Sequence, residues 1–218
     1  IMEGARIGKN CSIFPGAVIA AVPQDLKFEG EDTLAEIGDN TTIRECVTIN
    51  RGTSDRQKTK IGKNCLIMAY CHVAHDCFIG DYCIFSNNST LAGHVTIGDY
   101  VILAGLVAVH QFCTIGDHAF IAGGSLVRKD VPPYVKAARE PLSYVGINSV
   151  GLRRRGFTSE KIAEIQNIYR ILYQKKFNNS QASGIIEAEM VATPERDEII
   201  QFISSSQRGI MKGYFQKN

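Results

Sequence analysis

An aliphatic residue or Phe stands at every sixth position from Ile61 to Val127, and this period constrains the fold more than any other feature of the sequence. The frame holds without a slip, and Gly often follows the aliphatic residue. The fifth place of each hexad is always small or of modest size: Cys, Ser, Ala or Val. An amphipathic helix has a period near 3.6, and a half-buried strand a period of two. A period of six is instead typical of a parallel β-helix, in which each hexad forms one short strand and a corner.

The repeat resembles that of the hexapeptide-repeat proteins, whose fold is a left-handed parallel β-helix with three hexads per triangular coil. The resemblance implies an all-β, left-handed coil of eighteen residues, although most parallel crossovers are right-handed. Residues eighteen apart in sequence should then stack about 4.8 Å from one another. This spacing predicts which residues share a face of the coil.

We predict that residues 1–137 form the β-helix, with two loops near residues 23–36 and 51–60. Both breaks are polar, and both are whole multiples of six, so that each loop would replace coil positions without shifting the frame. Pro132-Pro133 should end the repeat because proline cannot continue a strand ladder. The chain begins at Ile1 inside a running repeat, and we expect that N-terminal rungs are missing from it.

Residues 138–218 are predicted to form a small α-helical domain that caps the open end of the coil. After an N-cap at Thr158, apolar residues recur with helical spacing from Ile162 to Leu172. Asn178-Asn179 should end this helix. Two further helices are predicted over residues 185–191 and 195–205.

The seven cysteines follow the repeat, which argues against a disulfide framework or a zinc-binding motif. Six occupy the fifth place of a hexad, Cys46 occupies a fourth place, and no C-x-x-C pair occurs. We interpret them as small buried residues in a reducing cytoplasm. The sequence has no apolar run long enough to cross a bilayer and no signal peptide, so we predict a cytoplasmic location without stable membrane insertion.

The charge is unevenly distributed along the chain. The net charge of +2 indicates no special partner and gives no reason to expect nucleic-acid binding. Residues 1–127 carry a net charge of −4, however, and residues 128–218 a net charge of +6. The basic half suits an acidic partner, although solvated helix faces explain it equally well.

Three of the five histidines should share one face of successive coils: His75, His94 and His110. A histidine with an acidic neighbour, as in His75-Asp76, can take a proton from a hydroxyl group. Gly93 should lie directly over His75, where its N–H could stabilise a reacting carbonyl oxygen. The alternatives are a surface histidine bonded to a turn and a glycine that relieves a tight corner.

Two other kinds of site compete with acid–base chemistry. Clustered histidines can bind zinc, and the hexapeptide fold includes zinc-dependent carbonic anhydrases, but these have a His pair separated by four residues that this chain lacks. Arg153-Arg154-Arg155 suits a phosphate group, since guanidinium forks match phosphate oxygens. No glycine-rich phosphate loop or dinucleotide fingerprint accompanies it.

Several longer motifs resemble those of the UDP-N-acetylglucosamine 3-O-acyltransferases, which catalyse the first step of lipid A biosynthesis. They cover nearly the whole chain in the family's order and spacing: Gln24–Lys27, Ile49–Thr53, His72–Cys77, Asn87–His94, Val109–Phe112, Asp130–Tyr134 and Gly151–Phe157. The family often has an acidic residue where this chain has Val150, which places one ribose or uracil contact in question.

The resemblance implies a homotrimer with active sites between neighbouring coils, using acyl carrier protein as acyl donor and UDP-N-acetylglucosamine as acceptor, without a cofactor or metal. It implies that His75 is the general base, Asp76 its orienting partner and the Gly93 N–H the oxyanion donor. The substrate-binding residues that it implies are His72, His94, His110 and Gln111 for positioning, Asp25 and Lys27 for the sugar and phosphates, Asn148, Arg154 and Arg155 for the nucleotide, and Gly123 for the acyl groove.

Three rival functions stay open from the sequence. The N-acyltransferase that acts later in the same pathway shares the fold, but it ordinarily has an N-terminal uridine-binding domain, which nothing here resembles. A zinc hydratase is the second rival. A non-catalytic β-helical scaffold is the third, although a scaffold would not need a column of histidines.

Overall fold

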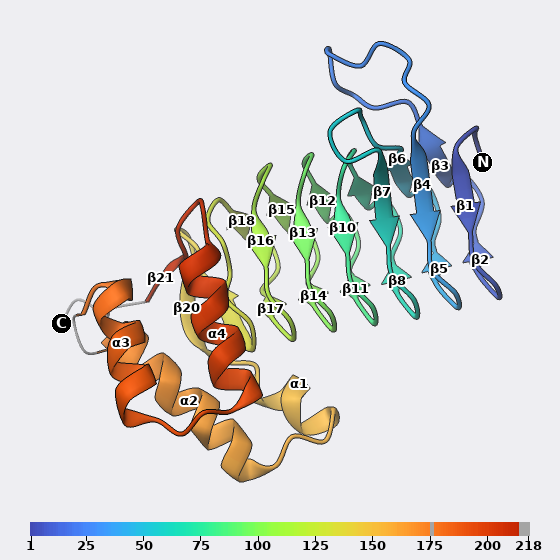
Figure 1. The fold of residues 1–218 in the computed structure, drawn as a ribbon. Helices are drawn as coiled ribbons and strands as arrows, with labels where there is room; N and C mark the ends of the chain where they lie inside the picture. Colours follow the sequence, from blue (N-terminus) through green and yellow to red (C-terminus); the bar gives the residue numbers. More distant parts are fainter. Residues whose placement is uncertain (175–176, 214–218) are drawn as a thin grey trace.

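Residues 1–174 and 177–213 are described by a computed structural model, in which a long three-sided coil leads into a cluster of helices (Figure 1). One side of the coil, sheet A, contains β1 (Ala5–Ile7), β4 (Leu34–Ile37), β7 (Lys58–Ile61), β10 (Phe78–Ile79), β13 (Thr96–Ile97) and β16 (Thr114–Ile115). Sheet B begins with β2 (Ser12–Ile13), β5 (Thr42–Ile43), β8 (Leu66–Ile67), β11 (Ile84–Phe85), β14 (Ile102–Leu103) and β17 (Phe120–Ile121). Sheet C contains β3 (Val18–Ala21), β6 (Thr48–Asn50), β9 (His72–Val73), β12 (Thr90–Leu91), β15 (Ala108–Val109) and β18 (Leu126–Val127).

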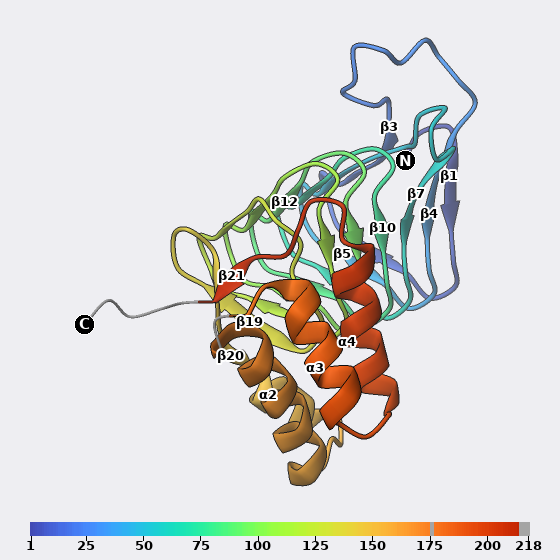
Figure 2. The same cartoon turned by 60° about the vertical axis from the view of Figure 1, so that its left-hand side comes forward.

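The register of the strands confirms a coil of eighteen residues. In sheet A, Ile61 pairs with Ile79, Ile79 with Ile97, and Ile97 with Ile115, always in parallel. The chain passes from sheet A to sheet B to sheet C and returns to sheet A one rung further on (Figure 2). The fold is therefore the parallel β-helix that the hexads predict, with the left-handed coil that the family resemblance implies.

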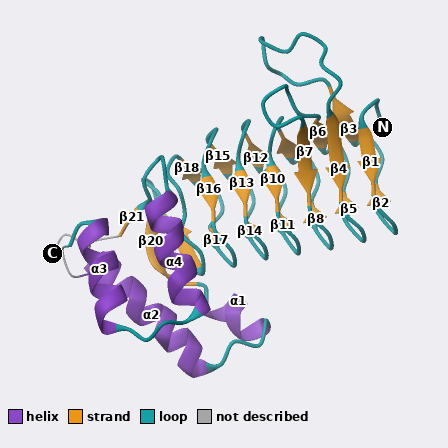
Figure 3. Cartoon of the chain, in the orientation of Figure 1, coloured by secondary structure: helices purple, strands orange, loops and turns teal. Residues whose placement is uncertain are grey.

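The two predicted loops are additions to the coil, so the expectation that they replace coil positions is wrong. Ile7 pairs with Ile37 and Ile37 with Ile61, which are separations of 30 and 24 residues in place of eighteen. The loops span residues 22–33 and 51–57, because β4 and β7 begin before the predicted loop ends. Both connect sheet C to sheet A, and Figures 1 and 3 show them projecting from the same edge.

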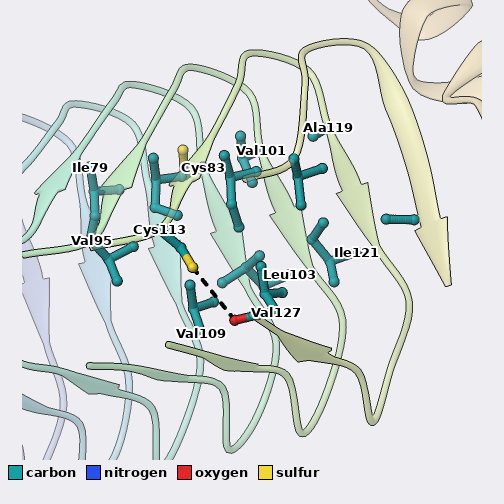
Figure 4. Packing of buried hydrophobic residues seen from close by; sticks show 14 of the residues in the cluster. Ile79, Cys83, Val95, Val101, Leu103, Val109, Cys113, Ala119, Ile121 and Val127 are labelled. Carbon is teal, nitrogen blue, oxygen red and sulfur yellow. Dashed lines mark hydrogen bonds between the residues drawn. The ribbon is translucent and has the colours of Figure 1, made fainter. Parts of the chain in front are cut away.

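The interior of the coil is filled by the first and fifth residues of each hexad, and Figure 4 shows this packing. The fifth-place side chains also bond to the backbone one turn on: the thiols of Cys65, Cys77 and Cys83 donate to carbonyls fifteen residues later at 3.2, 3.2 and 3.1 Å. Burial raises the pKa of Cys77 to about 12, so this thiol stays protonated and unreactive. All seven thiols are free, but Cys46 is exposed and Cys11 half-buried, contrary to the prediction that all are buried.

The fourth residue of nearly every hexad turns the corner in a left-handed backbone conformation. In the coils after Ile61, examples are Asn64, Asp76, Asn88, His94 and His118, with φ between 55° and 62°. This region is uncommon for residues other than Gly, and Asn, Asp and His are the residues most enriched in it. Functional side chains at corners therefore adopt a backbone shape that the coil imposes.

The prediction that the paired prolines end the coil is wrong, because the coil continues beyond them. Val131 still bridges to Ile115, and β19 (Val135–Ala138) pairs in parallel with β17. The prolines lie between these two pairings, at a corner where no ladder N–H is required. β20 (Ser143–Ile147) then adds an antiparallel strand and β21 (Lys212–Gly213) a parallel one, so that β20 covers the edge of β19, the last strand of the coil in sheet B.

In the described part of the chain, four helices lie at this end of the coil (Figure 2): α1 (Ser149–Arg154), α2 (Ser159–Gln174), α3 (Asn179–Glu189) and α4 (Pro194–Ser205). The Thr158 hydroxyl caps α2 as predicted. Asn178, however, begins α3 by a capping box, since its side chain accepts from the Gln181 N–H. The predicted second helix over 185–191 therefore starts too late. The Tyr169 hydroxyl donates to the Pro133 carbonyl at 2.6 Å and fixes α2 on the coil. No helix within residues 1–174 and 177–213 has the length and apolar character needed to cross a membrane.

Interior packing predicts that substitution of two leucines lowers the free energy of unfolding by very different amounts. Leu103 is fully buried in β14, whereas Leu26 is fully exposed in the 22–33 loop. We expect Leu103→Ala to lower the free energy of unfolding by about 2–5 kcal/mol because it leaves a cavity in the coil. Leu26→Ala, the matched control, should change it by less than about 0.5 kcal/mol. Urea unfolding of both variants checks this, and equal losses would contradict the packing account.

Candidate active site

The coil brings two columns of polar residues to the corner between sheets C and A. Val73, Leu91 and Val109 are register partners in successive coils. The third places of their hexads are His75, Gly93 and Gln111, and the fourth places are Asp76, His94 and Phe112. Backbone bonds join the corners, with His94 N–H donating to the His75 carbonyl at 3.1 Å. The stacking that the sequence predicts for His75, Gly93 and Gln111 is therefore present.

His75 and Asp76 contact each other although they are neighbours in sequence. In a regular strand, successive side chains point to opposite faces. Asp76 has a φ of 58°, and this left-handed corner brings its carboxylate to the ring, with His75 Nδ1 and Asp76 Oδ2 2.8 Å apart. The Asp76 side chain is fully buried and that of His75 is 13% exposed.

The Asp76 carboxylate is enclosed by hydrogen-bond donors. Its Oδ1 accepts from the N–H groups of Thr53 and Arg56 at 3.0 and 3.2 Å, and its Oδ2 accepts from the Thr53 hydroxyl at 2.6 Å and from His75. Burial raises the pKa of Asp76, but the bonds from His75, Thr53 and Arg56 outweigh it and lower the pKa to about 2. An ionised carboxylate only accepts, so His75 Nδ1 is the donor of this bond, and in the neutral imidazole Nε2 is the nitrogen with the lone pair.

Gly93 lies against the His75 ring and could not be replaced by another residue without movement. A Cβ built on Gly93 would come within 2.7 Å of both Cε1 and Nε2 of His75. The Gly93 carbonyl accepts from the Phe112 N–H at 3.2 Å. Among the residues that the structure describes, the Gly93 N–H has no acceptor. The backbone of Gly93, whose N–H has no acceptor among these residues, thus lies against the imidazole ring of His75.

Both loops extend from this corner, and the longer one forms a wall over it. A cavity of about 540 Å³ is lined by residues of the loop and of the corner: Gln24, Asp25, Leu26, Lys27, His75, His94, Gln111 and Phe112. The loop is tied to the coil, since the Asn50 side chain donates to the Val22 carbonyl at 2.9 Å and the Thr33 hydroxyl to the Gly52 carbonyl at 2.6 Å. The predicted residues Asp25, Lys27, His75, His94 and Gln111 therefore surround one cavity.

Three other predicted residues lie outside this cavity. His72 Nδ1 is 2.7 Å from the Thr48 hydroxyl, and burial, with a smaller effect of His75, lowers the pKa of His72. His110 is exposed and lies 3.1 Å from the Gln111 carbonyl. Gly123 is exposed and has an ordinary backbone conformation, in contrast to Gly124 with a φ of +70°.

The predicted nucleotide contacts lie around a second cavity of about 430 Å³. Its lining includes Asn148, Val150 and Arg154 together with Lys136 and Phe120. Its described lining residues include two positively charged side chains, Lys136 and Arg154, and no carboxylate. Within one chain the structure does not bring these residues to His75.

Arg155 does not line this cavity with Arg154, because its side chain packs against Tyr100 instead. Its guanidinium donates to the Tyr100 carbonyl at 3.0 Å and lies 5.2 Å from the centre of the Tyr100 ring. Tyr100 belongs to a stack of rings at the corner between sheets A and B, in which His118 follows at 4.8 Å. Burial, with a smaller effect of Arg155, lowers the pKa of His118 to about 4.

Sequence reasoning missed the residues that support the acid–base pair. Thr53 and Arg56 contact Asp76 from the 51–57 loop, and Phe112 stacks on His94 at 4.7 Å. The stack could have been found, because Phe112 is eighteen residues from His94. The contacts of Thr53 could not, because an inserted loop has no place in the coil register.

His75, Asp76 and His94 also have the proximity of metal ligands. One ligand atom from each lies within 4.8 Å of the others. Each oxygen of Asp76 already accepts two hydrogen bonds, and a cation would have to displace some of them. This arrangement favours acid–base chemistry over metal binding.

Comparisons with known proteins agree on one family. The family model described as UDP-N-acetylglucosamine O-acyltransferase, domain 2, matches residues 130–211, and the bacterial transferase hexapeptide model matches residues 58–93. An acyl-[acyl-carrier-protein]–UDP-N-acetylglucosamine O-acyltransferase of Thermodesulfovibrio yellowstonii is 48% identical over 97% of this chain and 83% of its own. That of Halorhodospira halophila is 42% identical over 95% of this chain and 81% of its own.

The chain belongs to the UDP-N-acetylglucosamine O-acyltransferase family.

Solved structures of family members share the fold over nearly the whole chain. The UDP-N-acetylglucosamine acyltransferase of Bacteroides fragilis superimposes with a TM-score of 0.95 at 52% identity, covering 97% of this chain and 83% of that one. The Arabidopsis family member superimposes with a TM-score of 0.86 at 34% identity, covering 96% and 90%. The family that the motifs indicate is thereby confirmed.

The hydrogen bonding of Asp76 predicts that the protein works without a metal ion. We expect acyl-transfer activity to be unchanged by an excess of chelator, and elemental analysis of the purified protein to find only substoichiometric zinc. Activity that falls with chelator and returns with added zinc would show instead that His75, Asp76 and His94 are metal ligands.

Proposed function

We propose that this protein transfers an (R)-3-hydroxyacyl chain from acyl carrier protein to the 3-hydroxyl of UDP-N-acetylglucosamine, the first step of lipid A biosynthesis, with His75 as the general base. The observation that carries the proposal is the geometry around His75. Its Nδ1 is held by a buried carboxylate, and the backbone of Gly93 lies against its ring. Among the described residues, neither His75 Nε2 nor the Gly93 N–H has a hydrogen-bond partner. Acyl transfer requires these two groups together.

Each group has a defined task in the reaction. His75 Nε2 takes the proton of the sugar 3-hydroxyl while the oxygen of that hydroxyl attacks the thioester carbonyl carbon. The Gly93 N–H donates to the carbonyl oxygen as negative charge develops there, and such a donor contributes about 3–4 kcal/mol to the transition state. The C–S bond then breaks, and His75 returns the proton to the departing thiolate. Asp76 stabilises the imidazolium that exists between these steps.

The cavity over His75 suits the sugar and its diphosphate. Lys27 supplies a cation for phosphate oxygens and Asp25 a carboxylate for sugar hydroxyls, both at the cavity wall. Gln111 and His94 face the same space and position the substrate. We assign His72 in β9 and His110 directly after β15, both on the sheet C side of this corner, to supporting contacts with the substrate.

The nucleotide end is assigned to Asn148, Arg154 and Arg155. Asn148 and Arg154 line the second cavity, while Arg155 lies behind it against Tyr100. Because one chain keeps this cavity apart from His75, a site that uses both requires two subunits. This supports an oligomer, which we take to be the homotrimer that the family resemblance implies. Exposed apolar side chains lie along the sheet C side of the coil at Tyr70, Leu106 and Leu126, where a neighbour could cover them.

Gly123 is assigned to the acyl groove. The atoms nearest to a Cβ built on Gly123 would be the Gly105 carbonyl oxygen at 3.1 Å, which is a tight contact, and Ala104 Cβ and the Gly105 nitrogen at 3.9 Å. The position is exposed, so a larger side chain would extend into the space beside the coil. Each methylene buried there would contribute about 0.8 kcal/mol.

The donor protein and the location follow from charge and thiol chemistry. Acyl carrier protein is acidic, and the net charge of +6 on residues 128–218 would attract it at low salt. We place the reaction in the cytoplasm, where free thiols such as the seven here stay reduced.

Replacement of the base tests the proposal. In an assay with hydroxyacyl carrier protein and UDP-N-acetylglucosamine, we expect His75→Ala to lose roughly 100- to 10,000-fold in turnover while it keeps its fold and oligomeric state. Lys63→Ala, at an exposed corner away from the site, should behave like the wild type. Near-normal turnover by His75→Ala would refute the role of His75, and an inactive wild type would refute the reaction itself.

A further inference from the structure

One carboxylate oxygen of Asp76 lies between two imidazole rings. Asp76 Oδ2 is 2.8 Å from His75 Nδ1 and 3.8 Å from His94 Nε2. The two rings are perpendicular, with their centroids 5.1 Å apart. A modest rotation of the carboxylate would exchange one histidine for the other. Something must therefore hold Asp76 on the ring that performs the chemistry.

Thr53 is placed to do this with both of its donors. Its N–H donates to Oδ1 and its hydroxyl donates to Oδ2, so the backbone and the side chain of Thr53 each hydrogen-bond one oxygen of the carboxylate. The hydroxyl also accepts from the Asp55 N–H at 3.3 Å, which leaves its proton directed at Asp76. Thr53 is 7% exposed, and water therefore competes little for these bonds.

The loop that carries Thr53 is anchored independently of Asp76's side chain. The Arg56 guanidinium donates to the Asp76 carbonyl at 3.0 Å and to the Thr96 hydroxyl at 3.2 Å, and it lies 4.9 Å from the centre of the Phe78 ring. On the other side of Thr53, the Gly52 carbonyl accepts from the buried Thr33 hydroxyl. Thr53 is thus presented on a rigid support.

We propose that Thr53 is a positioning residue for acyl transfer, whose hydroxyl keeps the Asp76 carboxylate on His75 and away from His94. This role rests on the proposed function of His75. Without the hydroxyl, Oδ1 keeps its two backbone donors, but Oδ2 keeps only the His75 ring, and the carboxylate can turn about Oδ1 toward His94. The imidazole of His75 then loses the partner that orients its free nitrogen and stabilises its charged form.

Substitution at position 53 separates positioning from folding. Thr53→Val keeps the shape and removes the hydroxyl, and we expect kcat to fall by roughly 10- to 100-fold with the KM of both substrates unchanged, since the contact matters only in the transition state. Thr53→Ser should restore kcat to near the wild-type value. Ser54→Ala, which removes a neighbouring exposed hydroxyl, should have no effect.

A double-mutant cycle with Asp76→Asn decides whether Thr53 acts through Asp76. Thr53→Val should add little to the loss already caused by Asp76→Asn, because both changes remove the same support. Independent losses would overturn the proposal, as would an equal kcat for Thr53→Val and the wild type. If Thr53→Val fails to fold, Thr53→Ala carries the same comparison.

A crystal structure of the Thr53→Val variant tests positioning without relying on turnover. We expect the Asp76 carboxylate to have rotated away from His75 Nδ1, toward His94. An unmoved carboxylate would refute the proposal even if the acceptor sugar proved to be another one. The wild type could instead lack acyl-transfer activity while the Asp76 carboxylate is displaced in the Thr53→Val crystal structure. That pair of results would count against the proposed reaction and not against the positioning role of Thr53.

Discussion

The stacking of one apolar side chain per hexad inside a narrow coil is the constraint on which the rest of the structure depends. Ile61, Ile79, Ile97 and Ile115 follow one another in register, and their equivalents fill sheets B and C in the same way. The two inserted loops lengthen their turns from eighteen to 30 and 24 residues, and the interior stack resumes in register after each. The register of the interior also fixes the positions of the surface residues, so that surface residues far apart in sequence lie at fixed distances from one another.

The corner conformation converts this register into a site. A left-handed residue at the fourth place sets Asp76 and His94 at angles that a strand would not allow. The inserted loops leave from the same corner, and one closes a cavity over the histidines while the other holds the carboxylate. The acid–base pair is therefore supported by coil geometry on one side and by an insertion on the other.

Much of this arrangement can be predicted from the sequence because it follows from periodicity. The hexad frame predicts the coil, and counting by eighteen places Gly93 over His75 and Gln111 over Gly93. Contacts outside the frame cannot be counted in this way. Thr53 lies in an insertion, and the packing of Arg155 on Tyr100 depends on where the chain turns after β20.

Local signals also mislead where tertiary context decides. Pro132-Pro133 has the composition of a strand terminator, but the prolines fall at a corner, and β19 resumes the ladder. Asn178-Asn179 has the composition of a helix end, yet Asn178 caps the start of α3. In both cases the residue type is suited to a boundary, and only the fold determines on which side of the boundary the element lies.

The central claim is that His75 accepts the proton of the hydroxyl group that is acylated. The most direct measurement is a crystal structure with UDP-N-acetylglucosamine bound. The account predicts that the sugar 3-hydroxyl oxygen lies about 3 Å from His75 Nε2, within hydrogen-bond reach, and that the sugar occupies the cavity formed with Asp25 and Lys27. A nucleotide sugar bound with its 3-hydroxyl far from His75 would contradict it.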